Sequence, residues 1–250
     1  MARRRRSDLP DGAFHVIAHA VADEPLFYDD IDRRRYLGLL QQAAQRHRWK
    51  VLTFVLLDNH VHLLIVAAAR DLSGALWSLH WGYATHFHER HPSRRGHVFE
   101  SRPKTLPIKT ERYLLAVLRY IANNPVTAGI CARPEAYRWS AHRALLAMSE
   151  PMPVVATADV LFRFGADLQS ARMRYAAFVA GEDPAEHKVV RRWSEAPPHD
   201  RPPLAEILTA GDQGDAMRAA YFEWGYSMRA IASVVGLDPA TISRRMRRER

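Results

Sequence analysis

The sequence predicts an α+β fold, a ferredoxin-like sandwich with an antiparallel sheet, followed by a helical C-terminal extension. Two observations support this prediction. Apolar patterns in the first half of the chain follow the order strand, helix, strand, strand, helix, strand, with a third helix appended. Two β-branched-rich runs also flank Asp58-Asn59, a pair that favours a tight turn between strands. Because this fold hosts many activities, the function must be inferred from the site.

The individual elements are predicted from periodicity and from helix-capping residues. Asp29 or Asp30 offers an N-cap for the first helix, and Thr110 offers one for the third, which Asn124-Pro125 is expected to stop. Pro103 and Pro107 confine the last strand to an edge. The predicted elements are a strand at 13–21, a helix at 31–48, a strand pair within 51–66, a helix at 72–89, a strand at 104–108 and a helix at 111–123.

Charge and composition narrow the class of partner. The net charge of +9 and the pI near 10.0 favour a polyanion, and most of the cations are arginines, which bind phosphate through two donors at once. Codon bias or an unspecialised basic surface explains the high ratio of arginine to lysine as well as a function in phosphate binding does. Neither explains the net excess of positive charge. Basic clusters lie at both ends of the chain, at 3–6 and 244–250, where arms that contact nucleic acid are common.

Length and residue usage limit the other classes. With 250 residues and 48% apolar content, the chain is expected to form one or two domains. It has no apolar run long enough for a membrane span and no signal-peptide core, so we expect a soluble, cytoplasmic, nucleoid-associated protein. Its single cysteine, Cys131, excludes an internal disulfide and a cysteine-based zinc site. A bound metal would therefore be held by nitrogen and oxygen.

The second strand of the predicted pair opens with His60 and His62. Side chains alternate along a strand, so these two imidazoles lie on one face about 7 Å apart. This geometry suits one metal ion, although an isolated His-x-His is more often structural. The surrounding strand is apolar, and burying two imidazoles there without a ligand or hydrogen bonds would be costly.

The third predicted helix carries further candidate residues. Its buried face is predicted from Leu114, Leu118 and Ile121, and a neighbouring stripe is expected to border the sheet edge, partly reachable by solvent. In that stripe Tyr120 has Asn124, a neutral oxygen ligand, one turn further on. An open site made by His60, His62 and Asn124 would suit Mg²⁺ or Mn²⁺, beside a tyrosine able to attack phosphorus. The whole stripe is Tyr113, Val117, Tyr120 and Asn124.

Five segments of the chain form one set of motifs. They are Phe14-His15-Val16, Glu24-Pro25-Leu26-Phe27, Asp58-Asn59-His60-Val61-His62-Leu63-Leu64, Gly96-His97-Val98-Phe99 and Arg119-Tyr120-Ile121-Ala122-Asn123-Asn124-Pro125-Val126-Thr127-Ala128-Gly129. Together these segments resemble the single-tyrosine HUH transposases, specifically the REP-associated tyrosine transposases, over residues 9–144. This resemblance implies the HUH nuclease fold, a divalent metal on His60 and His62 with Asn124 as third ligand, and Tyr120 as nucleophile. It also implies cleavage of single-stranded, hairpin-forming DNA, with a 5′-phosphotyrosine intermediate and a free 3′-OH.

The chain departs from the family at two places. Ala18-His19-Ala20-Val21 replaces a Ser-Arg-Gly-Asn-like turn, and Glu100-Ser101-Arg102 replaces a Gln-Gly-Arg-like stretch. Neither change touches the implied ligands or the nucleophile. Both are expected to alter how DNA is held.

The domain prediction divides the chain into a catalytic domain at 1–145, a helical extension at 146–194, a proline-rich linker at 195–203 and a helix-turn-helix at 204–250. In the extension, Gly165 breaks a helical pattern over 158–180. In the last unit a helix at 228–235, a turn at Gly236 and a second helix from Asp238-Pro239 predict contact with duplex DNA; a helical hairpin that merely packs is the alternative. The predicted DNA contacts are Arg3, Arg4, Arg5, Arg6, Arg102, Lys104, Thr241, Ser243, Arg244, Arg245 and Arg247.

Two functions from different classes follow. The first is a metal-dependent, transposase-like endonuclease and strand transferase acting on single-stranded hairpin DNA in DNA transposition and recombination. The second is a catalytically silent, sequence-specific DNA-binding regulator. The presence of His60, His62, Tyr120 and Asn124 together favours the enzyme. Both hypotheses predict a monomer or homodimer with no membrane partner.

Overall fold

The computed structural model describes residues 6, 9–21, 24–181, 203–209, 213–218, 220, 228–237 and 241. Two compact units divide the chain. One spans Arg5–Asp183 and contains the sheet, and the other contains the helices α8, α9 and α10. Each unit has its own core and is described separately below.

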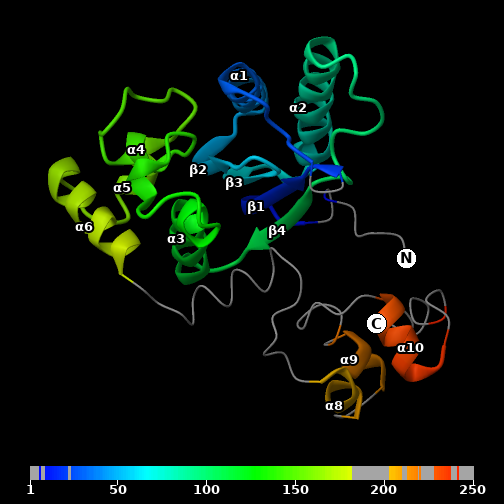
Figure 1. Cartoon of the computed structure of the whole chain (residues 1–250). Coiled ribbons are helices and arrows are strands. Elements are labelled where there is room, and N and C mark those ends of the chain that lie inside the picture. Colours follow the sequence, from blue (N-terminus) through cyan, green and yellow to red (C-terminus); the bar gives the residue numbers. More distant parts are fainter. Residues whose placement is uncertain are drawn as a thin grey trace. The chain divides into compact units, whose positions relative to one another are not determined.

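A four-stranded antiparallel sheet forms the centre of the first unit (Figure 1). Its strands are β1 (Gly12–His19), β2 (Lys50–Leu56), β3 (His60–Ala67) and β4 (Lys104–Ile108), in the spatial order β2-β3-β1-β4. Together with the element order, this arrangement confirms the predicted ferredoxin-like α+β class. The tight connection predicted at Asp58-Asn59 is also present, and it is closed by a hydrogen bond from Leu57 N to His60 O.

Helices α1 (Asp30–His47) and α2 (Ala69–Arg90) cover one face of the sheet (Figure 1). Helix α1 is capped by Asp29, whose carboxylate accepts the backbone N–H groups of Ile31 and Asp32, as predicted. Helix α2 begins at Ala69, before the predicted start at Leu72. Its first turn is held from a distance, since Ala69 N donates to the Asp11 carboxylate at 2.8 Å. Local periodicity carries no sign of such a contact.

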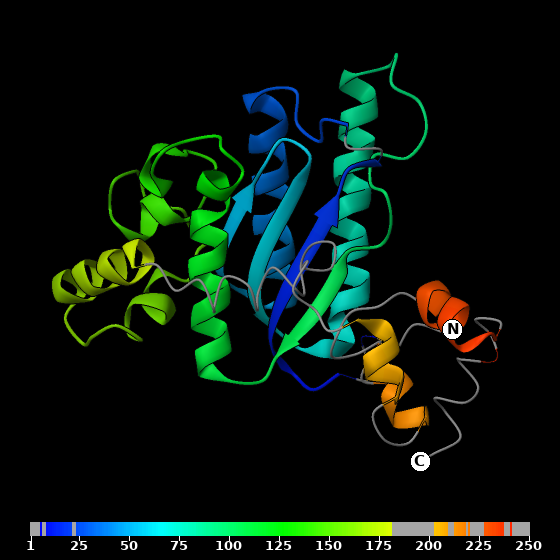
Figure 2. The same cartoon turned by 60° about the horizontal axis from the view of Figure 1, so that its bottom comes forward.

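Helix α3 (Glu111–Thr127) lies across the opposite face of the sheet (Figure 2). The prediction that Asn124-Pro125 stops this helix is wrong. Proline removes only its own N–H from the helical ladder, and the turn continues through bonds from Ala128 N to Asn124 O and from Ile130 N to Pro125 O, both 2.9 Å long. The chain leaves the helix near Gly129, at φ +70°. Asn124 therefore remains in helical geometry, one turn beyond Tyr120.

The expectation that the stripe containing Tyr120 is partly reachable by solvent holds for Tyr113, which is half-buried, and is wrong for the other three residues. Val117, Tyr120 and Asn124 are 0%, 2% and 3% exposed. The reason is that Tyr120 and Asn124 face the side chains of β1 and β3, in the middle of the sheet and away from its edge. The other side of α3 is covered as well, because Asn123 Nδ2 donates to Val179 O at 3.0 Å.

The segment after α3 packs against the outer edge of β2. It contains the short helices η3 (Pro134–Ala136), α4 (His142–Leu145) and α5 (Thr157–Leu161), and the longer α6 (Leu168–Ala180). The predicted break at Gly165 falls between α5 and α6. Isolated bridges pair Val51 with Val155 and Val55 with Ser140, so this edge of the sheet is not left open.

The second unit contains α8 (Leu204–Thr209), α9 (Gln213–Arg218) and α10 (Met228–Val235). The helix predicted at 228–235 and the turn at Gly236, which has φ +72°, are confirmed. The predicted second helix lies outside the described residues, apart from Thr241. None of the described helices has the length and apolar character needed to cross a membrane. The core of this unit is formed by Leu204, Ile207, Met217, Ala220, Ile231 and Ala232.

Candidate active site

Four histidines share the face of the sheet that α3 covers. In the β1–β3 pair, Ile17 is opposite His62 and His19 is opposite His60. Residues opposite one another in an antiparallel pair point to the same face, and side chains alternate along each strand. His15 and His19 therefore lie on the same face as His60 and His62. The first two come from β1 and the other two from β3.

The four imidazoles form a continuous cluster. The rings of His19 and His60 stack with centroids 5.1 Å apart, and the rings of His60 and His62 are perpendicular with centroids 5.0 Å apart. His15 Nε2 lies 3.0 Å from His62 Nδ1, within hydrogen-bond distance. Sequence reasoning identified His60 and His62 and missed the two histidines of β1. Their spacing of four residues puts them on one face of β1, but only the register of β1 against β3 shows that this is the face of His60 and His62.

Helix α3 brings Tyr120 and Asn124 to this cluster. The Tyr120 ring meets the His62 ring edge-on, at 88° and with centroids 5.4 Å apart. The side-chain amide nitrogen of Asn124 lies 3.4 Å from His62 Nε2. An amide flip would place the oxygen of Asn124 at that position, because its oxygen and nitrogen are assigned from their neighbours. The four residues predicted from the sequence, His60, His62, Tyr120 and Asn124, thus lie together within one chain.

A neighbouring side chain orients each implied histidine ligand. Asn59 Oδ1 lies 2.8 Å from His60 Nδ1 and can accept its proton, which leaves the lone pair of His60 on Nε2. In the same way, His15 Nε2 can accept a proton from His62 Nδ1 and leave the lone pair of His62 directed towards Asn124. Hydrogen bonds of this kind fix the tautomer of metal-binding histidines.

Burial keeps the inner histidines neutral. Desolvation lowers the pKa of His15 to about 3. It also lowers the pKa of His62 well below the usual value, with further depression from His15, His60 and His19. A metal ligand must be deprotonated, so both imidazoles have the required form at neutral pH.

The family of this region follows from a sequence comparison. Residues 10–124 match the family model described as Transposase IS200 like. This part of the chain is an IS200-like transposase domain. The match runs from before β1 to Asn124 and so includes the whole histidine cluster and Tyr120. It confirms the family predicted from the sequence motifs.

The other comparisons add little to this assignment. A solved structure described as "Structure of the REP associates tyrosine transposase bound to a REP hairpin" matches 61% of this chain and 90% of that chain, with 15% identity and a TM-score of 0.49. Likeness at that level does not establish a shared ligand. None of the curated proteins matches the chain.

The side chains of the transposase domain fit a metal ion only as a mixed donor set. In the described part of the chain, no group of three histidine, cysteine, aspartate or glutamate side chains could hold a metal. A set of His60, His62 and Asn124 uses an amide oxygen instead. Adjacent ligands of an octahedral ion with bonds of about 2.1 Å are about 3 Å apart, close to the 3.4 Å between His62 Nε2 and the Asn124 amide. His62 and Asn124 therefore have roughly the spacing of two ligands on one cation that accepts nitrogen and oxygen.

Three predicted DNA contacts lie near β4 of the transposase domain. Arg102 and Lys104 are exposed at the start of this strand. Arg6 joins them, because its side chain donates to Thr105 Oγ1 at 2.9 Å and to the Pro103 carbonyl. Thr241 is half-buried in the second unit. The remaining predicted contacts, Arg3, Arg4, Arg5, Ser243, Arg244, Arg245 and Arg247, lie outside the described residues.

Proposed function

We propose that the transposase domain is a metal-dependent endonuclease and strand transferase for single-stranded, hairpin-forming DNA, as in the REP-associated branch of the family. One observation carries the proposal: Tyr120 lies against His62 and one helical turn from Asn124, inside an IS200-like domain. A nucleophile of this kind needs a phosphate held beside it and a positive charge close to that phosphate.

The proposed reaction is a phosphoryl transfer to tyrosine. The Tyr120 oxygen forms a bond to phosphorus, and the bond from phosphorus to the 3′ oxygen of the preceding nucleotide breaks. The phenolic proton is lost and the leaving 3′ oxygen gains one, so the products are a 5′-phosphotyrosine and a 3′-OH. Attack of another 3′-OH on the phosphotyrosine reverses these changes and transfers the strand.

His60, His62 and Asn124 would hold Mg²⁺ or Mn²⁺, which would neutralise charge on the scissile phosphate. The chain itself contributes the neutral form of His62, enforced by burial, and the orientation of both rings by Asn59 and His15. Helix α3 keeps Asn124 and Tyr120 on one face, because the helix continues through Pro125.

We propose that Tyr120 works together with the histidines of its own subunit. Its ring lies 5.4 Å from that of His62 in the same chain, which supports action in cis. The side chain is only 2% exposed, however, so a phosphate can reach its oxygen only if the tyrosine or its surroundings move. We infer that DNA binding includes this rearrangement.

The proposal is tested by trapping the covalent intermediate. The full chain is incubated with Mn²⁺ and a labelled hairpin oligonucleotide that carries single-stranded flanks, and adducts are resolved by denaturing electrophoresis. A Tyr120→Phe variant keeps the ring that packs against His62 and is expected to form no adduct. Tyr113→Phe is the matched control, since Tyr113 lies on the same helix and does not contact the cluster. It is expected to form the wild-type amount.

The alternative function, a silent DNA-binding regulator, predicts a different result. In that case no hairpin gives an adduct with the wild-type chain, while binding to duplex DNA is retained. An adduct that persists in Tyr120→Phe would contradict the assignment of Tyr120 as the nucleophile. The chain would still be an enzyme, but another residue would attack phosphorus.

A further inference from the structure

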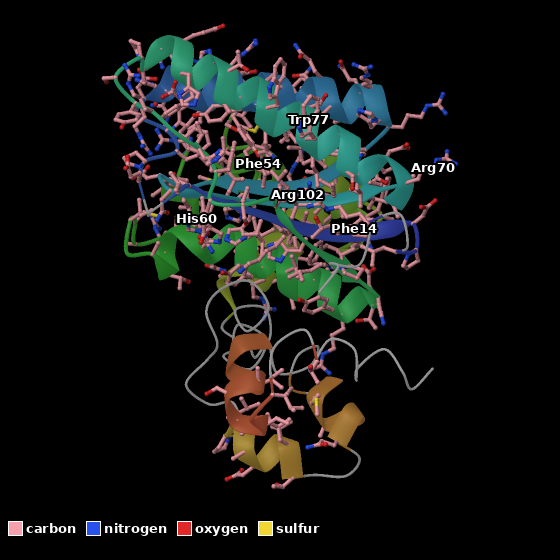
Figure 3. All side chains as sticks on the ribbon, turned by 90° about the vertical axis from the view of Figure 1, so that its right-hand side faces the viewer. Phe14, Phe54, His60, Arg70, Trp77 and Arg102 are labelled. Carbon is pink, nitrogen blue, oxygen red and sulfur yellow. The ribbon has the colours of Figure 1, made fainter. Side chains whose placement is uncertain are left out.

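Two tryptophans form an exposed stack on α2. Trp77 and Trp81 are 64% and 59% exposed, and their rings are nearly parallel, at 13°, with centroids 5.6 Å apart. Residues four apart on a helix lie side by side, which accounts for the stack. Large aromatic rings are seldom left in solvent as a pair, and contiguous exposed apolar surface usually marks a binding site. Figure 3 marks the position of Trp77 on this helix.

The stack forms one wall of a groove of about 600 Å³. This volume lies within the range of roughly 300–1,000 Å³ that is common for small-molecule and cofactor sites. The opposite wall is the segment that leads into β4 and includes Phe99 and Arg102. Both charged side chains among the described lining residues, Arg6 and Arg102, are cationic. The groove therefore combines flat apolar surface with positive charge.

The segment opposite the tryptophans is hydrogen-bonded to the end of β1. Glu100 N donates to His19 O at 3.0 Å, and Val21 N donates to Val98 O at 3.1 Å. His19 in turn stacks on His60. The segment that lines the groove is thus hydrogen-bonded to the end of β1 that carries part of the candidate active site.

We propose that this groove binds unpaired bases of single-stranded DNA, which stack on Trp77 and Trp81 while Arg6 and Arg102 contact the adjacent phosphates. Aromatic platforms combined with cationic side chains are the usual means of holding single strands, because every base has a π-face and every link a negative charge. A protein partner without carboxylates at this position fits the groove less well, because Arg6 and Arg102 would then face no negative charge. The inference rests on the proposed function for the strand's role as substrate, but binding can be measured without cleavage.

The test measures binding of a short fluorescein-labelled oligothymidine by anisotropy, with the full chain and without divalent metal. The double variant Trp77→Ala with Trp81→Ala is expected to bind roughly 5- to 150-fold more weakly, the loss that follows from stacking on one base. Phe162→Ala is the matched control, because Phe162 is 63% exposed on the far side of the domain, at the end of α5. It is expected to bind as the wild type does. Thermal unfolding checks that both variants keep their fold.

A second measurement locates the contact directly. An oligonucleotide that carries 5-iodouracil is irradiated with the wild-type chain, and cross-linked peptides are identified by mass spectrometry. The inference expects cross-links at Trp77 or Trp81. Unchanged oligothymidine affinity in the folded double variant, or a loss of self-association without any loss of DNA binding, would overturn it.

The two proposals can fail separately. If the wild-type chain forms the Tyr120 adduct and the double tryptophan variant binds and reacts normally, the groove inference fails and the proposed function stands. If cross-links form at the tryptophans but no hairpin yields an adduct, the groove binds single strands and the proposed chemistry fails.

Discussion

The Nε2 atom of His15 lies 3.0 Å from the Nδ1 atom of His62, and both side chains are fully buried. This contact joins the two central strands of the sheet beneath α3. When His15 accepts the Nδ1 proton, the other nitrogen of His62 keeps its lone pair and faces Asn124. His15 is therefore a positioning residue for the proposed metal site. Because His15 is fully buried, it performs this role without contacting DNA.

Replacing His15 with leucine is expected to weaken Mn²⁺ binding by about 10- to 100-fold, the usual loss when a hydrogen-bond partner of a metal ligand is removed. Leucine has a similar size but cannot accept the Nδ1 proton of His62. Electron paramagnetic resonance of free Mn²⁺ gives the affinity. His80→Leu is the matched control, because His80 is also a buried histidine but packs against Tyr36 and Phe99. Equal Mn²⁺ affinity in the two variants would show that His15 does not position His62 for metal binding.

Asn124→Ala is expected to lower Mn²⁺ affinity and adduct yield together. The variant removes the amide that lies 3.4 Å from His62 Nε2 while leaving α3 helical. Asn123→Ala is a stringent control from the adjacent position on the helix, since the Asn123 amide instead donates to Arg119 O and Val179 O. Asn123→Ala is expected to lose about 1 kcal/mol of stability and keep its Mn²⁺ affinity. Isothermal titration and chemical unfolding measure the two quantities.

The alternation of side chains along a single strand is enough to place His60 and His62 on one face from the sequence alone. It is not enough to find their neighbours. His15 and His19 join the cluster through the register of β1 against β3, which pairs His19 with His60, and register is a property of two strands. The same distinction applies to the helices. Asp29 caps α1 through backbone groups no more than three residues away and is predictable, whereas Asp11 holds the start of α2 from a distant segment and is not.

The end of α3 shows a different limit of local reasoning. Asn124-Pro125 is a common stop signal, yet the helix continues to Thr127 because the bonds that follow the proline compensate for one missing N–H. The burial of Tyr120 is not predictable from its helix either. Periodicity places its stripe beside the buried face, towards the sheet edge, while the packing of α3 directs it to the central strands.

The stability of the first unit is expected to fall as pH decreases from about 6.5 to 5. Burial lowers the pKa of His80 to about 4, so the folded protein leaves this group neutral where the unfolded chain binds a proton. Proton uptake by the unfolded state alone makes the free energy of unfolding rise with pH, by up to about 1.4 kcal/mol per pH unit for one group. His80→Leu is expected to show a shallower slope over this window, measured by urea unfolding at several pH values. An unchanged slope would mean that His80 does not hold this pKa.

Asp32 is the residue whose loss we expect to destabilise the first unit most. Its carboxylate is fully buried and accepts from Arg90, from Tyr28 N at 3.0 Å and from His91 at 3.0 Å, joining the start of α1 to the end of α2. Asp32→Ala would leave the Arg90 charge with the more exposed Asp29 alone. The variant also leaves the Tyr28 N–H without its acceptor, and a buried donor left in this way costs about 1–3 kcal/mol.

The matched control for this change is Asp30→Ala, on the same turn of α1. The Asp30 carboxylate is 40% exposed and pairs with Arg138 at the surface, where an ion pair contributes about 1 kcal/mol or less. Urea unfolding of the two variants at neutral pH compares them directly. If Asp32→Ala loses no more stability than Asp30→Ala, water replaces the carboxylate freely and the cluster does not join the two helices. The larger loss at Asp32 would instead identify this buried pair as the contact that fixes α2, and with it the tryptophan groove, against α1.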